Sequence, residues 1–324
     1  MTADSLVDHD GALDYRFDSV TTTSANCTKC RVTLTGSTSY PYTTPAVPGD
    51  DIDLRAAFNA VSDVIENRPA PLREFDQIYM KAGDMVMQAE QVARWADGKH
   101  LAFIGDGDAI SICSVYLKHR GILPYGPDKV TVFDFDQRMC KSVERFADAE
   151  RLVSLSSVLY NCLDPFPGPT DFDCFYTNPP WGASNQGESV NVFVQRGMEA
   201  TEFAGEGAVV VADDPELTWP KEVLSNLQSF AVGNGYFVQR MMPQLHSYHL
   251  DDDPELRSCN VFLGPIFGAR RPTESLPISD PARLEHFYGR DKTPRVRYVK
   301  ERDRLDYGKA HESEYLLELL ESPE

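Results

Sequence analysis

Short apolar segments alternate with segments of helical period through the middle of the chain, and this alternation constrains the fold more than any other feature. The apolar segments are four to seven residues long and rich in Val, Phe and Ile, which is typical of strands that are buried on both faces of a sheet. Helical segments between consecutive strands favour a parallel, doubly wound α/β sheet. We predict strands over 101–104, 129–135, 155–160, 174–177 and 208–212, with helices over 110–120 and 138–149.

Segments of other character flank this core. Helical patterns over 51–68 and 81–97 precede it, after an irregular arm that is rich in Thr, Ser, Asp and Pro. The last 25 residues have the composition of an acidic helical tail. We therefore divide the chain into a small N-terminal appendage at 1–70, a Rossmann-like catalytic domain at 71–270 and a C-terminal extension at 271–324.

The charge of the chain bears on its partners. It carries 31 Lys and Arg against 50 Asp and Glu, a formal net charge of −19. Proteins that bind nucleic acid through its phosphates need a cationic surface, so the acidic excess argues against a nucleic-acid partner. A small cationic amine as substrate accounts for the excess, and so does adaptation of the whole surface to a salty solvent.

Membrane and metal signals are sparse. No segment reaches the roughly 20 apolar residues that span a bilayer, and the N-terminus lacks a basic region followed by an apolar one, so we expect a cytoplasmic protein. Cys27 and Cys30 form one C-x-x-C pair, which is half of a structural zinc site, but no second pair follows. We therefore predict no metal, with this pair as the sole candidate, and the sequence leaves a homo-oligomer open.

The residues directly after the predicted strands are the candidate site, because ligands of doubly wound sheets bind beyond the carboxyl ends of the strands. Residues 105–108 (Gly-Asp-Gly-Asp) follow the first strand, where the glycines allow a tight turn close to a ligand. The second strand ends in Asp134-Phe-Asp136. An acid at this position accepts hydrogen bonds from ribose hydroxyls, so we assign Asp134 to a ribose; Asp136 is a second candidate, or the N-cap of the next helix.

The tetrapeptide Asn178-Pro-Pro-Trp181 follows the fourth predicted strand. Two prolines remove backbone donors and hold the chain extended, so that the Asn side chain and a proline carbonyl can accept hydrogen bonds from an amine. Trp181, Trp219 and Tyr176 can wall such a site, because an ammonium over an aromatic face gains about 0.5–2 kcal/mol. Core packing is the alternative for each ring, and it fits Tyr176 better than Trp181.

The tetrapeptide resembles motif IV of class I S-adenosylmethionine-dependent methyltransferases that modify exocyclic or amide nitrogens. A wider set of segments resembles the branched-chain polyamine synthase family, the N(4)-bis(aminopropyl)spermidine synthases. This set lies between roughly residues 75 and 265 and comprises Phe75-Asp-Gln77, Gly105-Asp-Gly-Asp108 with Ser111, Val132 to Arg138, Asp164-Pro-Phe-Pro167, the Pro-Pro step, Trp219, Gln228, Tyr248 and Ser258.

The resemblance implies a Rossmann-like class I methyltransferase fold and the transfer of aminopropyl groups from decarboxylated S-adenosylmethionine to a polyamine nitrogen. In that reaction Asp108 would act as the base and Asn178 would orient the nucleophilic nitrogen, with Asp106 as a third catalytic candidate. From the motifs and the resemblance together, the expected cofactor-binding residues are Gly105, Asp106, Gly107, Asp134, Asp136, Asn161 and Asp164. The expected substrate-binding residues are Asp76, Pro179, Pro180, Trp181 and Trp219.

The chain departs from the family pattern at three positions, each of which lacks a carboxylate of the family: Gly107, Asn161 and Asn178. Asp106 and Asp108 remain, and a carboxylate about 4 Å from the ammonium of the decarboxylated donor would favour it by about 1–4 kcal/mol. Asn178 instead favours the alternative function, an N-methyltransferase that uses intact S-adenosylmethionine on an amino or amide nitrogen. A binding protein that keeps the fold without turnover is a third hypothesis.

Overall fold

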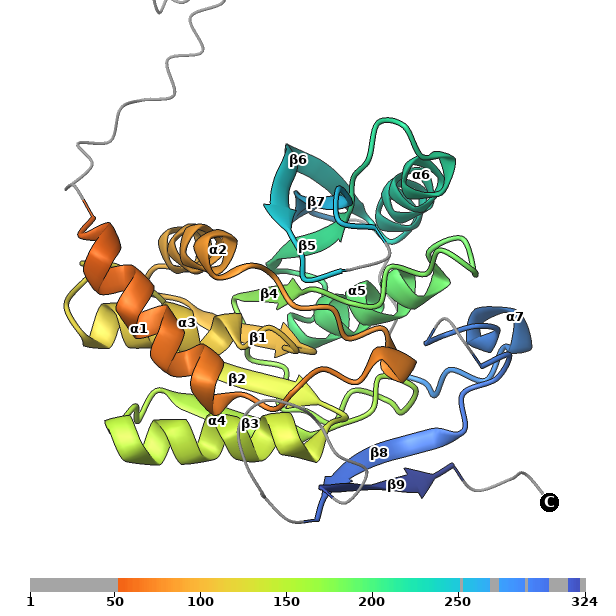
Figure 1. Ribbon diagram of the computed structural model, residues 1–324. Helices are drawn as coiled ribbons and strands as arrows, with labels where there is room; N and C mark the ends of the chain where they lie inside the picture. The colour runs from red at the N-terminus through yellow and green to blue at the C-terminus, as the bar shows by residue number, and fades with distance from the viewer. Residues whose placement is uncertain (1–51, 251–252, 269–273, 289–290, 303–313, 321–324) are drawn as a thin grey trace, which may run out of the picture. The chain divides into compact units, whose positions relative to one another are not determined.

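A computed structural model describes residues 52–250, 253–268, 274–288, 291–302 and 314–320 (Figure 1). Its centre is a seven-stranded sheet in the order β3-β2-β1-β4-β5-β7-β6, in which β7 is antiparallel to both of its neighbours and the first five strands are parallel. The strands of this sheet are β1 (His100–Ile104), β2 (Lys129–Asp134), β3 (Leu155–Leu159), β4 (Cys174–Thr177), β5 (Glu206–Ala212), β6 (Tyr236–Ser247) and β7 (Arg257–Pro265).

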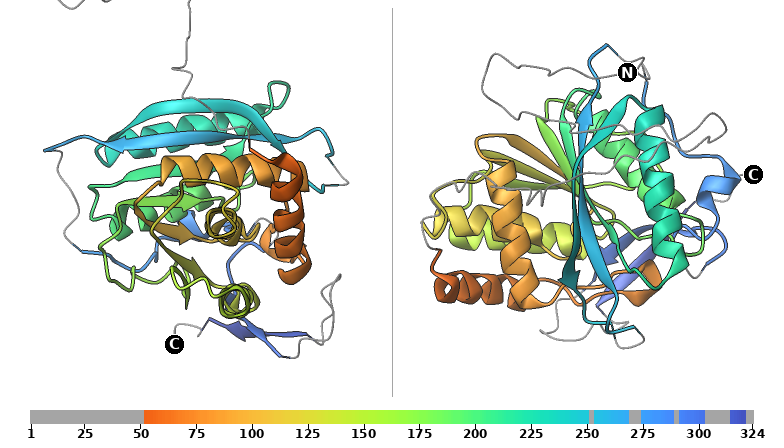
Figure 2. Two further views of the ribbon diagram at one scale, coloured as in Figure 1. Left: turned by 90° about the vertical axis from the view of Figure 1, so that its left-hand side faces the viewer. Right: turned by 90° about the horizontal axis from the view of Figure 1, so that it is seen from above.

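Helices cover both faces of the sheet, as the view from above shows (Figure 2). On one face lie α1 (Leu54–Asn67), α2 (Ala82–Trp95), α3 (Ile110–His119) and α4 (Gln137–Glu150), and on the other lie α5 (Glu188–Ala200) and α6 (Thr218–Gly233). The short elements η1 (Arg73–Phe75) and α7 (Pro281–Leu284) lie in the connections. Because the sheet is covered on both faces, β1, β2, β4 and β5 are buried almost along their whole length. The parallel edge strand β3 is partly exposed.

The strand register brings the predicted site together. Ile104 of β1 pairs with Phe133 of β2, and Phe103 pairs with Tyr176 of β4, so the turns after these three strands are neighbours. The chain runs from β1 outward to β2 and later returns to β4 on the other side of β1. Such a reversal of strand order opens a crevice at the carboxyl ends of the strands.

The predicted doubly wound fold of the class I methyltransferase type is confirmed, and the predicted strands and helices lie within three residues of the observed ones. Among the elements of the main sheet and the helices that cover it, α5, α6, β6 and β7 lie outside the prediction. In α5, polar residues such as Asn191 and Arg196 are buried together with apolar ones, so the helix has no apolar stripe that a helical period would reveal. The edge strand β6 is largely exposed and therefore lacks the apolar run of a buried strand.

The predicted helical tail is wrong for its described residues. Val296–Glu301 form β8 and Tyr315–Leu319 form β9, an antiparallel pair. Val299 of β8 donates its N–H to the Phe135 carbonyl, 3.1 Å away, next to the end of β2. A segment as short as β9 is too short to hold a helix by local propensity, so pairing with β8 decides its structure.

Residues 51–324 form one compact unit, in which α1 packs against α2 and α3. The domain limits at residues 70 and 270 stay predictions. The irregular arm and the Cys27–Cys30 pair lie outside the described residues.

Candidate active site

A cavity of about 290 Å³ lies at the carboxyl ends of β1, β2 and β4. Its lining combines the segment after η1, the turns after the three strands and the connection between β6 and β7. Of the predicted site residues, those in the lining are Asp76, Gly105, Asp106, Gly107, Asp108, Asp134, Asn178, Pro179, Pro180, Trp181 and Trp219. The structure therefore gathers most of the predicted site in one place.

The turn after β1 requires glycine at its first position. Gly105 has φ +72°, and a Cβ there would lie 3.0 Å from the Phe193 ring, so a side chain would be strained and crowded. The following Asp106 turns its carboxyl group toward the start of α3, where it accepts hydrogen bonds from the Ile110 N–H at 3.0 Å and from both the N–H and the hydroxyl of Ser111. Burial raises the pKa of Asp106 well above its usual range. Its carboxyl group therefore satisfies backbone donors at the start of α3.

Asp134 joins the turn after β1 to the turn after β2. One carboxylate oxygen accepts from the Asp106 N–H at 2.9 Å, and the other accepts from the Asp136 N–H at 2.8 Å. Burial, followed by the nearby Asp136 charge, raises the pKa of Asp134 to about 7 against the opposing effect of these hydrogen bonds. Since Asp134 lines the cavity, it is placed as a ribose acceptor would be.

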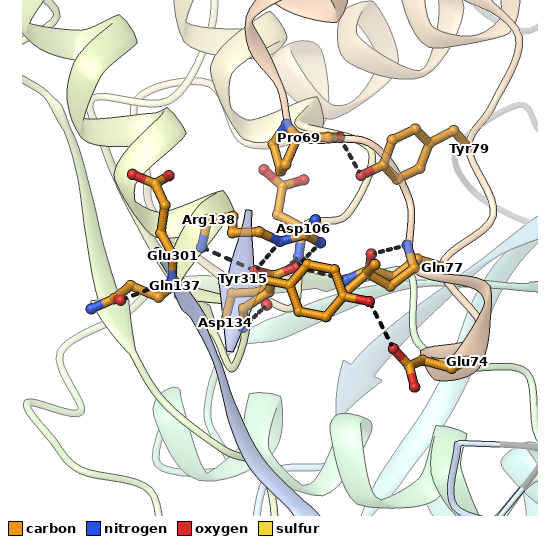
Figure 3. A network of polar contacts seen from close by, with 12 residues as sticks. Pro69, Glu74, Gln77, Tyr79, Asp106, Asp134, Gln137, Arg138, Glu301 and Tyr315 are labelled. Atoms are coloured by element: carbon orange, nitrogen blue, oxygen red, sulfur yellow. Dashed lines mark hydrogen bonds and ion pairs between the residues drawn. The ribbon is translucent and has the colours of Figure 1, made fainter. Parts of the chain in front are cut away.

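Asp136 lies outside the cavity lining and is engaged within the protein by Gln77 and Arg138. Both of these partners are labelled in the network of Figure 3. It caps α4 by accepting from the Arg138 N–H, and its two oxygens bind the Arg138 guanidinium at 3.0 and 2.6 Å. The Gln77 amide also donates to it at 3.2 Å, while the Gln77 oxygen accepts from the Leu72 N–H at 2.7 Å. Through this network Asp136 fixes the segment around η1 to the end of β2, and the N-cap alternative is the one the geometry supports.

Asp108 and Asn178 meet across the carboxyl ends of β1 and β4. The Asn178 Nδ2 donates to Asp108 Oδ2 at 2.8 Å, and the Met80 N–H donates to Oδ1 at 2.7 Å. The Asn178 amide must be oriented in this way, because its oxygen would otherwise face a carboxylate. Burial raises the pKa of Asp108, and the Arg68 guanidinium opposes this increase. The Asn178 oxygen is left as an acceptor for a further donor.

The predicted aromatic walls differ in their surroundings. The Trp181 ring packs edge-on against Tyr248, with 5.0 Å between ring centroids, and its indole N–H has no hydrogen-bond acceptor among the described residues. Trp219 is half-buried in the lining. Tyr176 lies outside the lining, fully buried, and its hydroxyl accepts from the Gln88 amide at 3.1 Å. Core packing is thus the role that the structure gives Tyr176.

Besides Asp136, two predicted cofactor residues lie outside the cavity lining. Asn161 is buried, where its amide donates to the Arg297 carbonyl and its oxygen accepts from the Leu163 N–H. Asp164 forms an ion pair with the Arg297 guanidinium at 2.8 Å. Both residues hold the connection after β3 to β8, and neither lines the cavity.

The prediction missed an aromatic group on the cavity wall. Phe135 stacks on Tyr288 with ring centroids 5.1 Å apart, and Phe75 packs edge-on against both rings. Phe75 and Phe135 could have been found from the sequence, because each adjoins a predicted acid. Tyr288 comes from the C-terminal extension and carries no sequence signal of its own.

Acidic side chains outnumber basic ones in the cavity wall. Its lining contains one basic side chain, Arg73, against the acidic side chains Asp76, Asp106, Asp108, Asp134 and Asp253. Among the residues that the structure describes, no group of three His, Cys, Asp or Glu side chains could hold a metal ion, and no helix is long and apolar enough to cross a bilayer. The arrangement therefore favours an organic ligand with cationic groups, aromatic character and hydroxyls.

Comparison with known proteins agrees with these observations. The chain matches the family "Branched-chain polyamine synthase A C-terminal domain" over residues 56–319. It is 27% identical to the N(4)-bis(aminopropyl)spermidine synthase of Thermus thermophilus over 187 residues, which are 56% of this chain and 50% of that protein. The synthase of the same name from Thermococcus kodakarensis is 26% identical over 171 residues, 51% of this chain and 46% of that protein.

Among solved structures, the branched-chain polyamine synthase of Thermus thermophilus, in complex with N4-aminopropylspermidine and 5′-methylthioadenosine, superposes with a TM-score of 0.57 at 22% identity. The match covers 69% of this chain and 67% of that one, and it shows the shared fold. The chain spans about half the length of the curated relatives it matches. Because the family match extends from α1 to β9, this protein belongs to the branched-chain polyamine synthase A C-terminal domain family.

Proposed function

We propose that this protein transfers an aminopropyl group from decarboxylated S-adenosylmethionine to a nitrogen of a polyamine. The observation that carries the proposal is the acidic cavity, in which five carboxyl side chains and one guanidinium line the space around Asn178. Both substrates of this reaction are cations, and carboxylates attract them over a distance of several ångströms. The complex of the Thermus thermophilus relative, which holds an aminopropylated polyamine and 5′-methylthioadenosine, supports the same reaction.

The reaction is a displacement at carbon. The lone pair of a neutral amine attacks the propyl carbon that is bonded to the sulfonium, the carbon–sulfur bond breaks, and 5′-methylthioadenosine leaves with the bonding electron pair. The nitrogen becomes positively charged and then releases a proton. Because an ammonium group has no lone pair to attack with, the site must hold the amine in its neutral form or remove its proton.

Asp108 and Asn178 are placed for these two tasks. The Asp108 carboxyl group is nine-tenths or more buried in the cavity wall, and among the described residues only Met80 and Asn178 donate hydrogen bonds to its oxygens. It can therefore accept the amine proton. The Asn178 oxygen points its lone pairs away from Asp108 and can hold an N–H of the same amine, which would position the nitrogen for attack.

Asp106 has a different task in the proposal. Its carboxyl group already accepts hydrogen bonds from backbone N–H groups at the N-terminus of α3. We therefore propose that Asp106 holds the turn after β1 in place and does not accept the amine proton. Asp134 and the wall of Phe75, Phe135 and Tyr288 would receive the nucleoside of the donor.

N-methyl transfer from intact S-adenosylmethionine is the second candidate, and the side chain of Asn178 is the observation that favours it. An amide at this position accepts a hydrogen bond from an amino group without adding charge. The methionine carboxylate of intact S-adenosylmethionine would, however, meet the acidic wall. A cytoplasmic location is part of the proposal for either reaction.

Calorimetric titration with the two donors separates the candidates. We expect the wild-type protein to bind decarboxylated S-adenosylmethionine about tenfold or more tightly than the intact form, since each 1.4 kcal/mol is a factor of ten. Asp108→Asn should reduce aminopropyl transfer to spermidine, followed by mass spectrometry, by about 10²–10⁴-fold. Asp128→Asn, which removes an exposed carboxylate, is the control and should behave as wild type.

Tighter binding of intact S-adenosylmethionine, together with a methylated product, would replace the proposal by N-methyl transfer. Binding of neither donor would favour a protein that keeps the fold without catalysis. In the first case Asn178→Ala should abolish methylation, because the amide would be the group that positions the acceptor.

A further inference from the structure

A buried guanidinium contacts the catalytic turn from behind the cavity wall. Arg68 is the residue directly after α1, its side chain is 6% exposed, and it is not part of the cavity lining. Its Nη1 donates to the main-chain oxygen of Asp108 at 2.9 Å and lies 3.7 Å from Asp108 Oδ1. Arg68 therefore acts on both the backbone and the charge of Asp108, although 40 residues separate them.

Other side chains hold the guanidinium in this position. It lies over the Tyr79 ring, 3.9 Å from the ring centroid, and Nη1 also contacts Met85 Sδ at 3.4 Å. The Tyr79 hydroxyl donates to the Pro69 carbonyl at 2.8 Å, next to Arg68 in the chain. A planar guanidinium that is stacked on a ring and bonded at its edge has a single orientation.

The charged groups around Asp108 differ in their effects. Arg68, after α1, lowers the pKa of Asp108 more than any other charged group does, and His249, after β6, lowers it further. The Asp106 carboxyl group lies on the same turn, and its own pKa is raised in part by Asp108. The remaining titratable neighbours are held neutral by burial, which raises their pKa values: Tyr79, Tyr176, Tyr248 and Cys113. Arg68 is thus the main charge that opposes the increase in the pKa of Asp108 caused by burial.

We propose that Arg68 is a positioning residue of the active site, which holds the turn after β1 and favours the ionised form of the Asp108 carboxyl group before a cationic amine enters. The inference rests on the proposed function, in which Asp108 receives the amine proton. Once an ammonium is bound beside Asp108, the ligand itself supplies positive charge. The effect of Arg68 is therefore largest in the ligand-free protein, whose ionisations determine the pH profile of kcat/KM.

The test compares Arg68→Gln, which removes the charge, with Arg68→Lys, which keeps it. Two quantities are measured: the pKa of Asp108 in the ligand-free protein, by carbon NMR of its carboxyl group with Asp108→Asn as the assignment, and the acid limb of the kcat/KM profile. In Arg68→Gln we expect the Asp108 pKa and the acid limb to move to higher pH by about one unit. At a pH on the acid limb, kcat/KM of this variant should then be about tenfold lower than that of the wild type. In Arg68→Lys both should stay within a few tenths of a unit of wild type.

Arg55→Gln is the matched control, because it removes an exposed arginine near the opposite end of the same helix. Neither quantity should change in this variant. An Asp108 that titrates in folded Arg68→Gln as it does in wild type would overturn the inference. Equal losses of rate in the Gln and Lys variants without a shift of the Asp108 pKa would do so as well, since they would indicate a purely structural role.

Two further outcomes are decided by the same set of variants. If Arg68→Gln does not fold, the double variant Arg68→Gln/Asp108→Asn should fold, because no unpaired buried charge remains; its failure to fold would contradict the charge role. If the wild-type protein shows no aminopropyl transfer, the proposed function fails, but the NMR titration needs no substrate and still decides whether Arg68 sets the ionisation of Asp108.

Discussion

At the scale of single residues, three aspartates of one pattern have three different surroundings. Asp106 accepts backbone donors at the start of α3, Asp108 meets Asn178 and Met80, and Asp134 bridges two turns. Asp106 and Asp108 follow a buried strand and Asp134 ends one, and nothing in their order reveals which way each side chain points. Gly107 is also distinct from Gly105, because a Cβ there would lie at an ordinary 3.6 Å from the Tyr79 ring. Space alone therefore does not require glycine at position 107.

The raised pKa of Asp134 leads to a prediction about donor binding. With a pKa of about 7, this carboxyl group is partly protonated in the ligand-free protein at neutral pH. Ribose hydroxyls that donate to it bind the ionised form better, so binding lowers its pKa and releases a proton. Affinity for the donor should rise with pH up to about 7 and level off above it, and binding should release up to about half a proton per molecule at pH 7 and more at lower pH.

Calorimetry in two buffers of different ionisation enthalpy measures this proton release directly. Asp134→Asn, which has no proton to lose, should bind the donor more weakly and without the buffer dependence. Proton release that persists in this variant would assign the titration to another group. A wild-type affinity that is flat between pH 5.5 and 8 would contradict the ribose role of Asp134.

At the scale of elements, α5 holds the C-terminal extension against the sheet through buried side chains, among them Ser189 and Arg196. Arg196 is fully buried and donates to the Cys162 carbonyl, the Leu276 carbonyl and the Ser275 hydroxyl, and it pairs with Glu199 at 2.6 Å. The extension then continues to Tyr288 on the cavity wall. The position of Tyr288 therefore depends on contacts that no local sequence pattern contains.

Removal of this guanidinium should be costly. We expect Arg196→Met to lower the free energy of unfolding by about 3–5 kcal/mol, because Glu199 would remain buried without its partner. The matched control is Arg283→Met, which breaks a partly exposed ion pair between Arg283 and Glu188 of α5. This substitution should lower the free energy of unfolding by about 0–1 kcal/mol. Denaturant unfolding of both variants measures the difference, and similar losses would show that burial does not decide the contribution.

At the scale of the whole molecule, the acidic charge has two consequences that salt separates. With a net charge of −19, the acidic side chains repel one another in the folded state. Added salt screens this repulsion because the Debye length falls from roughly 10 Å at 0.1 M to 3 Å at 1 M. The same screening weakens the attraction of a polyamine to the acidic cavity.

We therefore expect opposite responses to sodium chloride between 0.05 and 1 M. The unfolding temperature should rise by about 2 °C or more for each kcal/mol of repulsion removed, while the affinity for spermidine should fall. Scanning calorimetry and equilibrium dialysis measure the two effects, with potassium chloride as a control for an effect of the sodium ion. An unfolding temperature that stays constant would show that the excess charge is too dispersed to destabilise the fold.

The sequence by itself determined the fold class, the parallel strands and the location of the candidate site at their carboxyl ends. These features follow from the periodicity of apolar residues within short segments and from the placement of Gly, Pro and Asp after strands. Residues that are neighbours in the sequence carry both signals. The turns at Gly105, Asp134 and Asn178 could be predicted for that reason, and the structure brings them to one cavity.

Only the tertiary structure decided what depends on residues that are distant in the chain. Arg68 and Tyr288 reach the site from segments outside the strand pattern, Asn161 serves β8 rather than the cavity, and β9 takes its conformation from pairing with β8. The physical reason is the same in each instance: direction of a side chain, burial of a charge and pairing of a short strand are set by the partner across the fold, and the local sequence does not specify that partner.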